Sequence, residues 1–123
     1  MHEFIIDKLE LILDSIKQIE FYTKDISNPD DFKKFENDLS KLDATMMRLQ
    51  AIGENIKKIN KTDSDFFSEI VLFDTNIIIR FRDFISHHYE KLDVDIVFDI
   101  CQNDIPLLKN KIQTFLSNNN ESV

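Results

Sequence analysis

The fold is decided by residues 32–56, which read FKKFENDLSKLDATMMRLQAIGENI. Apolar side chains recur there at alternating intervals of three and four, a spacing that places them on one face of an α-helix. The series consists of Phe32, Phe35, Leu39, Leu42, Met46, Leu49, Gly53 and Ile56. A stripe of this length predicts a long helix that packs against partner helices over most of its length. Glycine weakens a helix interior by roughly 0.5–1 kcal/mol relative to alanine, so Gly53 predicts a close approach by a neighbouring backbone or a ligand.

Similar stripes lie on both sides of this segment. Between residues 4 and 22 the stripe consists of Ile5, Leu9, Ile12, Ile16 and Ile19. Asn28-Pro29-Asp30 then breaks that helix, because proline disfavours helix at the residue before it. Asp93 is a suitable N-cap for a last helix, whose stripe consists of Val94, Val97, Cys101, Ile105, Leu108, Ile112 and Phe115. Pro106 lies inside that pattern, so it predicts a kink or a restart at Asp104.

The middle of the chain completes the predicted fold. Residues 60–65 carry polar capping residues and predict a loop, followed by a short helix over 66–71 and a longer one from residue 73 to the histidines. The sequence has only one Gly and two Pro, which favours an all-α fold. We expect an antiparallel bundle of four to five helices over residues 1–117, with a disordered tail over 118–123.

Composition narrows the class of protein. A chain of 123 residues is large enough for one domain. Its single cysteine, Cys101, excludes an intramolecular disulfide, and its place on an apolar stripe predicts a core residue. We see no export signal and no apolar run of the ~20 residues that span a bilayer. These features predict a soluble cytoplasmic protein that does not bind membranes.

The segment that can carry chemistry is residues 82–89, which read RDFISHHY. The Arg82 guanidinium can donate two parallel hydrogen bonds to a phosphate, and the His87 imidazole can exchange a proton near neutral pH. Together they suit RNA cleavage in which the 2′-hydroxyl attacks the adjacent phosphate without a metal ion. We find no glycine-rich phosphate loop and no metal-ligand spacing, so we expect neither a cofactor nor a metal.

The charge of the chain limits how it can meet RNA. The net charge of −8 opposes binding to a polyanion, because nucleic-acid binders gain affinity from lysine and arginine. Any RNA contact must therefore be local. The cations available for it are Arg80, Arg82, Lys57, Lys58 and Lys61.

Three motifs together resemble a known family. Arg82 and His87 match R-x4-6-H, and His87 and Tyr89 match the H-x-Y that follows it. Upstream, AIGEN at residues 51–55 resembles A-I-G-E-A, and downstream DIPLL at residues 104–108 resembles D-I-P-x-L. These motifs are similar to those of the HepT-like branch of the HEPN superfamily, whose fold is an up-and-down helical bundle.

The resemblance implies a function and a set of partners. HepT-like proteins are toxins of type II toxin-antitoxin systems that cleave RNA as homodimers, with a composite site at the interface. It implies Arg82 and His87 as catalytic residues. Glu54 matches the family signature and is a candidate supporting residue, as are Asp83 and Ser86 within the central motif. It also implies an antitoxin partner, a nucleotidyltransferase that attaches AMP to Tyr89. Both tRNA and mRNA are candidate substrates.

Departures from the family pattern leave alternatives open. Asp83 stands where the family usually has Asn, and its carboxylate can either repel a phosphate or orient His87. His88 is an additional imidazole, and Glu54 can pair with an arginine of the motif or with Lys57 or Lys58. The first alternative is therefore a non-catalytic subunit that binds a nucleotide or a nucleotidyltransferase. The second is a structural helical module whose acidic faces dock a basic partner.

Overall fold

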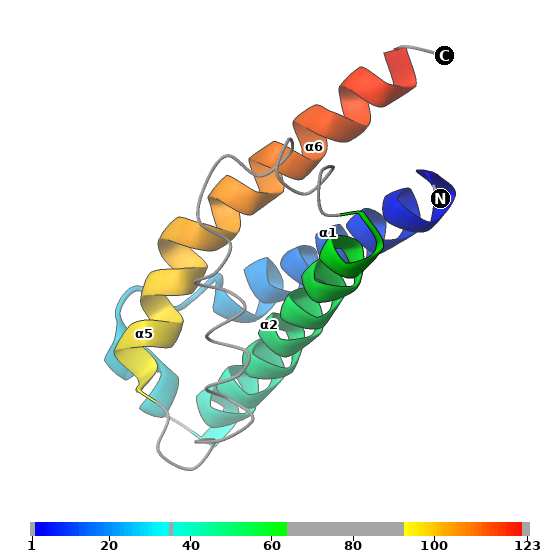
Figure 1. Ribbon diagram of the computed structural model, residues 1–123. Coiled ribbons are helices and arrows are strands. Elements are labelled where there is room, and N and C mark those ends of the chain that lie inside the picture. Colours follow the sequence, from blue (N-terminus) through cyan, green and yellow to red (C-terminus); the bar gives the residue numbers. More distant parts are fainter. Residues whose placement is uncertain (1, 35, 64–92, 122–123) are drawn as a thin grey trace.

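The computed structural model describes residues 2–34, 36–63 and 93–121, and these ranges are almost entirely helical (Figure 1). Their elements, in chain order, are α1 (His2–Thr23), the 3-10 helix η1 (Pro29–Lys33), α2 (Glu36–Thr62), α5 (Val94–Asp99), the π-helix η3 (Ile100–Asp104) and α6 (Ile105–Glu121). No strand occurs within these ranges, and the predicted all-α class is confirmed. The helices predicted over 66–71 and from residue 73 to the histidines lie outside the described residues.

Three long helical runs build the described part of the bundle. Figure 1 shows α1 and α2 side by side and antiparallel, while α5, η3 and α6 form one continuous run. That run packs against α1 through α6 and against η1 through α5. The Lys109 ammonium lies 2.8 Å from a Glu20 carboxylate oxygen and joins α6 to α1 at the surface. Figure 1 also shows that α2 and α6 run in the same direction and that α1 is antiparallel to both.

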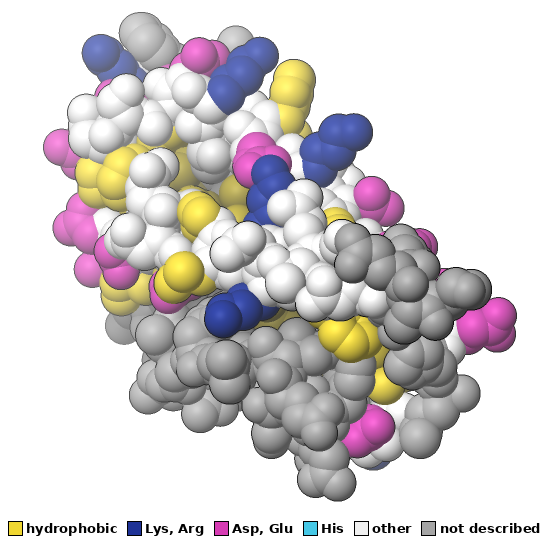
Figure 2. All heavy atoms as spheres, turned by 90° about the horizontal axis from the view of Figure 1, so that it is seen from above, with side chains coloured by type: hydrophobic (Ala, Val, Ile, Leu, Met, Phe, Trp, Pro, Cys, Tyr) yellow, Lys and Arg dark blue, Asp and Glu magenta, His cyan; other side chains and the backbone are white. Residues whose placement is uncertain are grey.

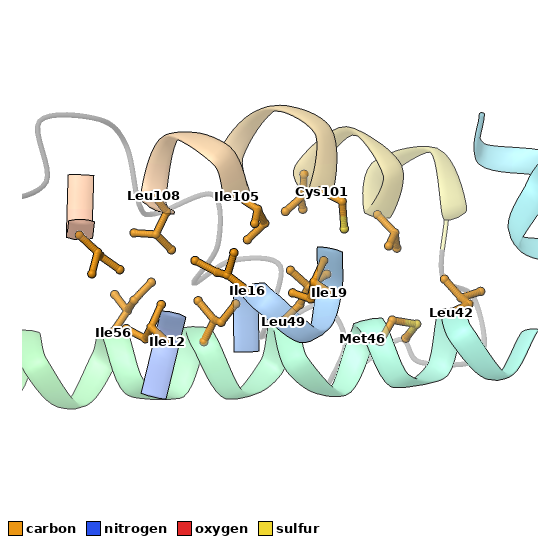
Figure 3. Close-up of a cluster of buried hydrophobic side chains, with 14 of the residues drawn as sticks. Ile12, Ile16, Ile19, Leu42, Met46, Leu49, Ile56, Cys101, Ile105 and Leu108 are labelled. Atoms are coloured by element: carbon orange, nitrogen blue, oxygen red, sulfur yellow. The ribbon is translucent and has the colours of Figure 1, made fainter. Parts of the chain in front are cut away.

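The hydrophobic core lies between these three runs (Figure 3). Every residue of the stripe predicted for the first helix is buried, and so are the stripe residues of the last run from Val94 to Ile112. Phe115 is partly buried against the same cluster. Figure 3 places Ile105 and Leu108 of α6 above Ile12 and Ile16 of α1, with Ile56 of α2 beside Ile12. The predicted stripes are thus confirmed on α1 and on the last run.

The long helix differs from its prediction at its start. α2 begins at Glu36, and Phe32 belongs to the separate 3-10 helix, where its side chain is 0% exposed. Phe35 lies outside the described residues. Leu39, which the stripe predicts to be buried, is 46% exposed. Its burial was predicted wrongly, since the covered part of α2 begins at Leu42.

The buried face of α2 is also wider than one stripe. Thr45, Ile52 and Ile59 are buried although they lie beside the predicted series. Together with the stripe, these residues form a face that is broad enough to contact neighbouring helices on two sides. Gly53 is buried on this face, which agrees with the close packing expected of a glycine within a helix.

The turn between α1 and α2 is held by one carboxylate. Asp31 accepts hydrogen bonds from the backbone amides of Ser27 at 2.8 Å and Asn28 at 3.3 Å. Pro29 occupies the first turn of η1, where its missing N–H costs nothing. The predicted break is therefore confirmed, and it directs Phe32 into the core.

Pro106 is accommodated without breaking the last helix. The amide of Ile105 donates to the carbonyl of Ile100, a bond across five residues that belongs to a π-helix. This wider turn ends at Asp104, and regular α-helix resumes at Ile105. The irregularity predicted at the proline is therefore present, as a π-helical turn within a continuous helical run. Asp93 is confirmed as the N-cap, because its carboxylate accepts the amide of Asp95 at 2.9 Å.

Two predicted boundaries fall short of the observed helices. α2 continues through Thr62, so residues 60–62, predicted as loop, are helical. The Thr62 hydroxyl donates to the Lys58 carbonyl at 2.9 Å, and the Asp63 amide donates to the Ile59 carbonyl at the same distance. α6 continues to Glu121, four residues past the predicted domain end at 117. No helix within the described ranges has both the length and the hydropathy needed to cross a bilayer.

Candidate functional site

The central motif of the candidate site falls outside the described ranges. This holds for Arg82, Asp83, Ser86, His87 and Tyr89, whose placement stays a prediction from sequence. The two flanking motifs do lie in the described part of the chain. They show which elements of the bundle those signatures build.

The upstream motif lies in the C-terminal half of α2. Ile52 is 0% exposed and Gly53 is buried, whereas Glu54 is exposed. Successive residues of an α-helix point about 100° apart, so the motif turns from the core to the surface within three positions. Its glycine allows close packing, and its carboxylate is accessible from solvent. Glu54 is therefore placed where a surface site on α2 can use it.

The downstream motif lies at the junction between η3 and α6. Ile105 is buried and closes the π-helical turn, and Pro106 is exposed. Asp104 is half-buried, and burial raises the pKa of its carboxyl, with a smaller contribution from the negative charge of Asp99. Asp99 itself accepts a hydrogen bond from the Asn103 side-chain amide at 2.6 Å. The motif thus has a structural role, because it shapes the π-helical turn that tolerates the proline.

The proximity of Asp99 and Asp104 was missed by sequence reasoning. The two residues are five positions apart, which places them on different faces of a regular α-helix. A π-helix bonds residues five apart and brings those positions together. The signal in the sequence is Pro106 within a continuous apolar stripe, which a helix can retain only by changing its hydrogen-bond pattern.

Cys101 is confirmed as a core residue. Its side chain is buried, and burial raises the pKa of the thiol to about 12. A thiol with that pKa has almost no nucleophilic thiolate at neutral pH. Within the described ranges, no three His, Cys, Asp or Glu side chains gather in a way that could hold a metal ion.

Comparison with known proteins gives the family. The sequence profile of the family described as "Ribonuclease HepT-like" matches residues 12–115, which is most of the chain. The chain belongs to the HepT-like ribonuclease family. The resemblance predicted from the three motifs is therefore confirmed, and the matched range contains all three of them.

Relatives of this HepT-like protein carry ribonuclease names. A "probable ribonuclease HepT" of Thermococcus cleftensis is 32% identical over 107 residues, which cover 87% of this chain and 91% of the relative. A "putative RNase" of Methanocaldococcus jannaschii is 30% identical over 95 residues, covering 77% of this chain and 73% of the relative. No solved structure gives a significant match.

One relative is much longer than this HepT-like protein. It is named "gamma-glutamylcyclotransferase and putative RNase" and also comes from Methanocaldococcus jannaschii. Its identity to this chain is 32% over 105 residues, covering 85% of this chain. The match spans only 44% of the relative's own length. The similarity therefore concerns one part of that longer protein.

Proposed function

We propose that this HepT-like protein is a metal-independent endoribonuclease and the toxin of a toxin-antitoxin system. The observation that carries the proposal is the Arg82–His87 spacing in a chain whose match to a ribonuclease family spans residues 12–115. The ribonuclease names of the relatives support an RNA substrate. A homodimer would bring two Arg82–His87 pairs to one cleft.

The proposed reaction uses only groups of the protein and of the RNA. His87 removes the proton of a 2′-hydroxyl, whose oxygen then attacks the adjacent phosphorus. The new oxygen–phosphorus bond closes a cyclic phosphate, while the bond to the 5′-oxygen breaks and that oxygen takes up the proton that His87 removed. Arg82 binds the phosphate oxygens as negative charge develops on them. General acid–base catalysis of this kind contributes about 10²–10⁴-fold to a rate.

Asp83 decides between this reaction and the non-catalytic alternative. A carboxylate beside His87 can fix the imidazole and favour its protonated form, but it also repels the RNA phosphate. If repulsion dominates, the same surface binds a nucleotide or a nucleotidyltransferase without cutting. We expect Asp83→Asn to leave cleavage in place or to increase it, because it restores the residue usual in the family.

Neutralisation is proposed to act at Tyr89. A cognate nucleotidyltransferase that attaches AMP to the phenol adds a bulky anion next to Arg82 and His87, which repels RNA. Incubation with that enzyme and ATP should add the mass of AMP to the wild-type protein and none to Tyr89→Phe. If the wild-type protein stays unmodified while the nucleotidyltransferase is active, neutralisation would have to act by binding that covers the site.

Toxicity in cells tests the proposal as a whole. We expect induced expression of the wild-type protein to stop growth, and His87→Ala to abolish that effect. The matched control is His88→Ala, which removes the same side chain one position further along and should remain toxic. Equal growth of all three strains, with the proteins present in equal amounts, would reject a toxin whose activity depends on His87.

A further inference from the structure

The last two turns of α2 carry the densest run of cations in the described part of the chain. Lys57, Lys58 and Lys61 fall within five residues, and all three are exposed. They lie outside the buried face of α2, and Lys57 is at its edge, four residues after the buried Gly53. No ion pair of the described residues involves any of them, whereas Lys41 and Lys109 each lie within 4.0 Å of a carboxylate. These three ammonium groups are therefore available to a ligand.

The helix itself explains only part of this cluster. Cations near a helix C-terminus stabilise the helix dipole, but the effect falls off within the last turn. Lys61 is the basic residue of that last turn. Lys57 and Lys58 lie further back and gain little from the dipole. Glu54 lies on the same exposed side. Because three lysines outnumber this one carboxylate, the cluster keeps an excess of positive charge.

The rest of the described surface makes this excess unusual. The chain has a net charge of −8, and α1 carries an exposed row of carboxylates, which consists of Glu3, Asp7, Glu10 and Asp14. Their spacing of four, three and four places them on one side of α1, and like charges at such spacing repel one another. A polyanion is therefore repelled by the first half of α1. The exposed end of α2 offers it three closely spaced positive charges.

We infer that Lys57, Lys58 and Lys61 form a patch that binds the phosphate backbone of single-stranded RNA. The inference rests on the proposed function, and it adds a place on the surface where the substrate is held. The patch begins two residues after the family motif at residues 51–55, and Lys57 lies about one turn after Glu54, so RNA bound to it lies close to Glu54. Long lysine side chains reach phosphates at several positions, which suits binding without sequence preference.

The test measures RNA binding in the absence of cleavage. A labelled single-stranded RNA is titrated with His87→Ala protein, followed by fluorescence anisotropy, at salt concentrations from about 50 to 200 mM. The test variant adds Lys57→Gln, Lys58→Gln and Lys61→Gln. The matched control adds Lys17→Gln, Lys33→Gln and Lys34→Gln, which remove the same charge from exposed positions toward the other end of α1 and α2. Circular dichroism confirms that each protein is folded.

The expected effect follows from counterion release. Each phosphate contact with a single strand contributes about 0.7 to the slope of log affinity against log salt, so the test variant should lose about 2 from that slope. At about 0.1 M salt this corresponds to about 100-fold weaker binding. The control variant should keep the slope and bind within a few-fold of its parent. Equal losses in both variants, or no loss in the test variant, would overturn the patch.

A cleavage assay with wild-type protein separates this failure from that of the proposed function. If the wild-type protein cuts RNA but the test variant binds as tightly as its parent, the patch is wrong and the ribonuclease stands. If the wild-type protein neither cuts nor binds RNA, the proposed function fails and the patch fails with it.

Discussion

Replacing Phe32 tests how the short 3-10 helix holds the bundle together. Phe32 is 0% exposed, and its element contacts both α2 and α5. Truncating a buried phenylalanine to alanine costs about 3–5 kcal/mol, because apolar contacts are lost and a cavity remains. Domains of this kind unfold with about 5–15 kcal/mol. Phe32→Ala should therefore remove a large share of the total stability.

The matched control is Phe21→Ala, which makes the same change on a side chain that is 64% exposed. Phe21 contacts the Lys24 ammonium at 4.6 Å from its ring centroid and the edge of Tyr22 at 6.0 Å between ring centroids. Exposed contacts of this type are worth about 0.5–1 kcal/mol, so the control should lose about 1 kcal/mol or less.

Urea unfolding followed by circular dichroism measures both variants. We expect the free energy of unfolding to fall by about 3–5 kcal/mol in Phe32→Ala, with an unchanged dependence on urea. If Phe32→Ala loses no more stability than Phe21→Ala, then Phe32 does not fill the core and the assignment of the 3-10 helix is wrong.

Three further changes probe single groups. Alkylation of Cys101 at pH 8 should be about 1000-fold slower in the folded than in the unfolded protein, because a thiol pKa raised from 9.0 to about 12 removes nearly all of the thiolate. Comparable rates in the two states would place the thiol at the surface. The buried Thr45 hydroxyl has no hydrogen-bond partner among the described residues, so Thr45→Val should raise the free energy of unfolding by about 1 kcal/mol, and a loss in urea unfolding would reveal a hidden partner. Asp104→Asn should stabilise the protein at neutral pH and not in acid, because a carboxyl whose folded pKa is raised destabilises the fold only where it ionises; a gain of equal size at both pH values would refute that cause.

The sequence predicted the long helices because their stripes are regular. On α1 every stripe residue from Ile5 to Ile19 is buried, and spacing alone suffices where one face meets the core. Phe32 was assigned to the wrong helix, since an interval of three residues fits a 3-10 helix as well as an α-helix. Ile52 and Ile59 were missed because a helix with neighbours on two sides buries more than one stripe.

Local hydrogen bonds set the features that periodicity could not predict. The passage of the last helix through Pro106 depends on the bond from the Ile105 amide to the Ile100 carbonyl, which no side-chain pattern encodes. The extension of α2 to Thr62 depends on capping bonds to backbone carbonyls of its last turns. For the candidate site, the sequence supplied three motifs, and the family match supports their assignment to HepT-like ribonucleases. The roles of Arg82, His87 and Tyr89 remain proposals.

The central claim is that this chain cuts RNA through His87 without a metal ion. The most direct measurement is cleavage of total cellular RNA in EDTA by the purified wild-type protein, His87→Ala and His88→Ala, each with its intact mass checked for modification. We predict cleavage by the wild-type protein and by His88→Ala, and none by His87→Ala. A folded, unmodified wild-type protein that leaves the RNA intact, or a His87→Ala protein that cuts at the wild-type rate, would contradict the claim.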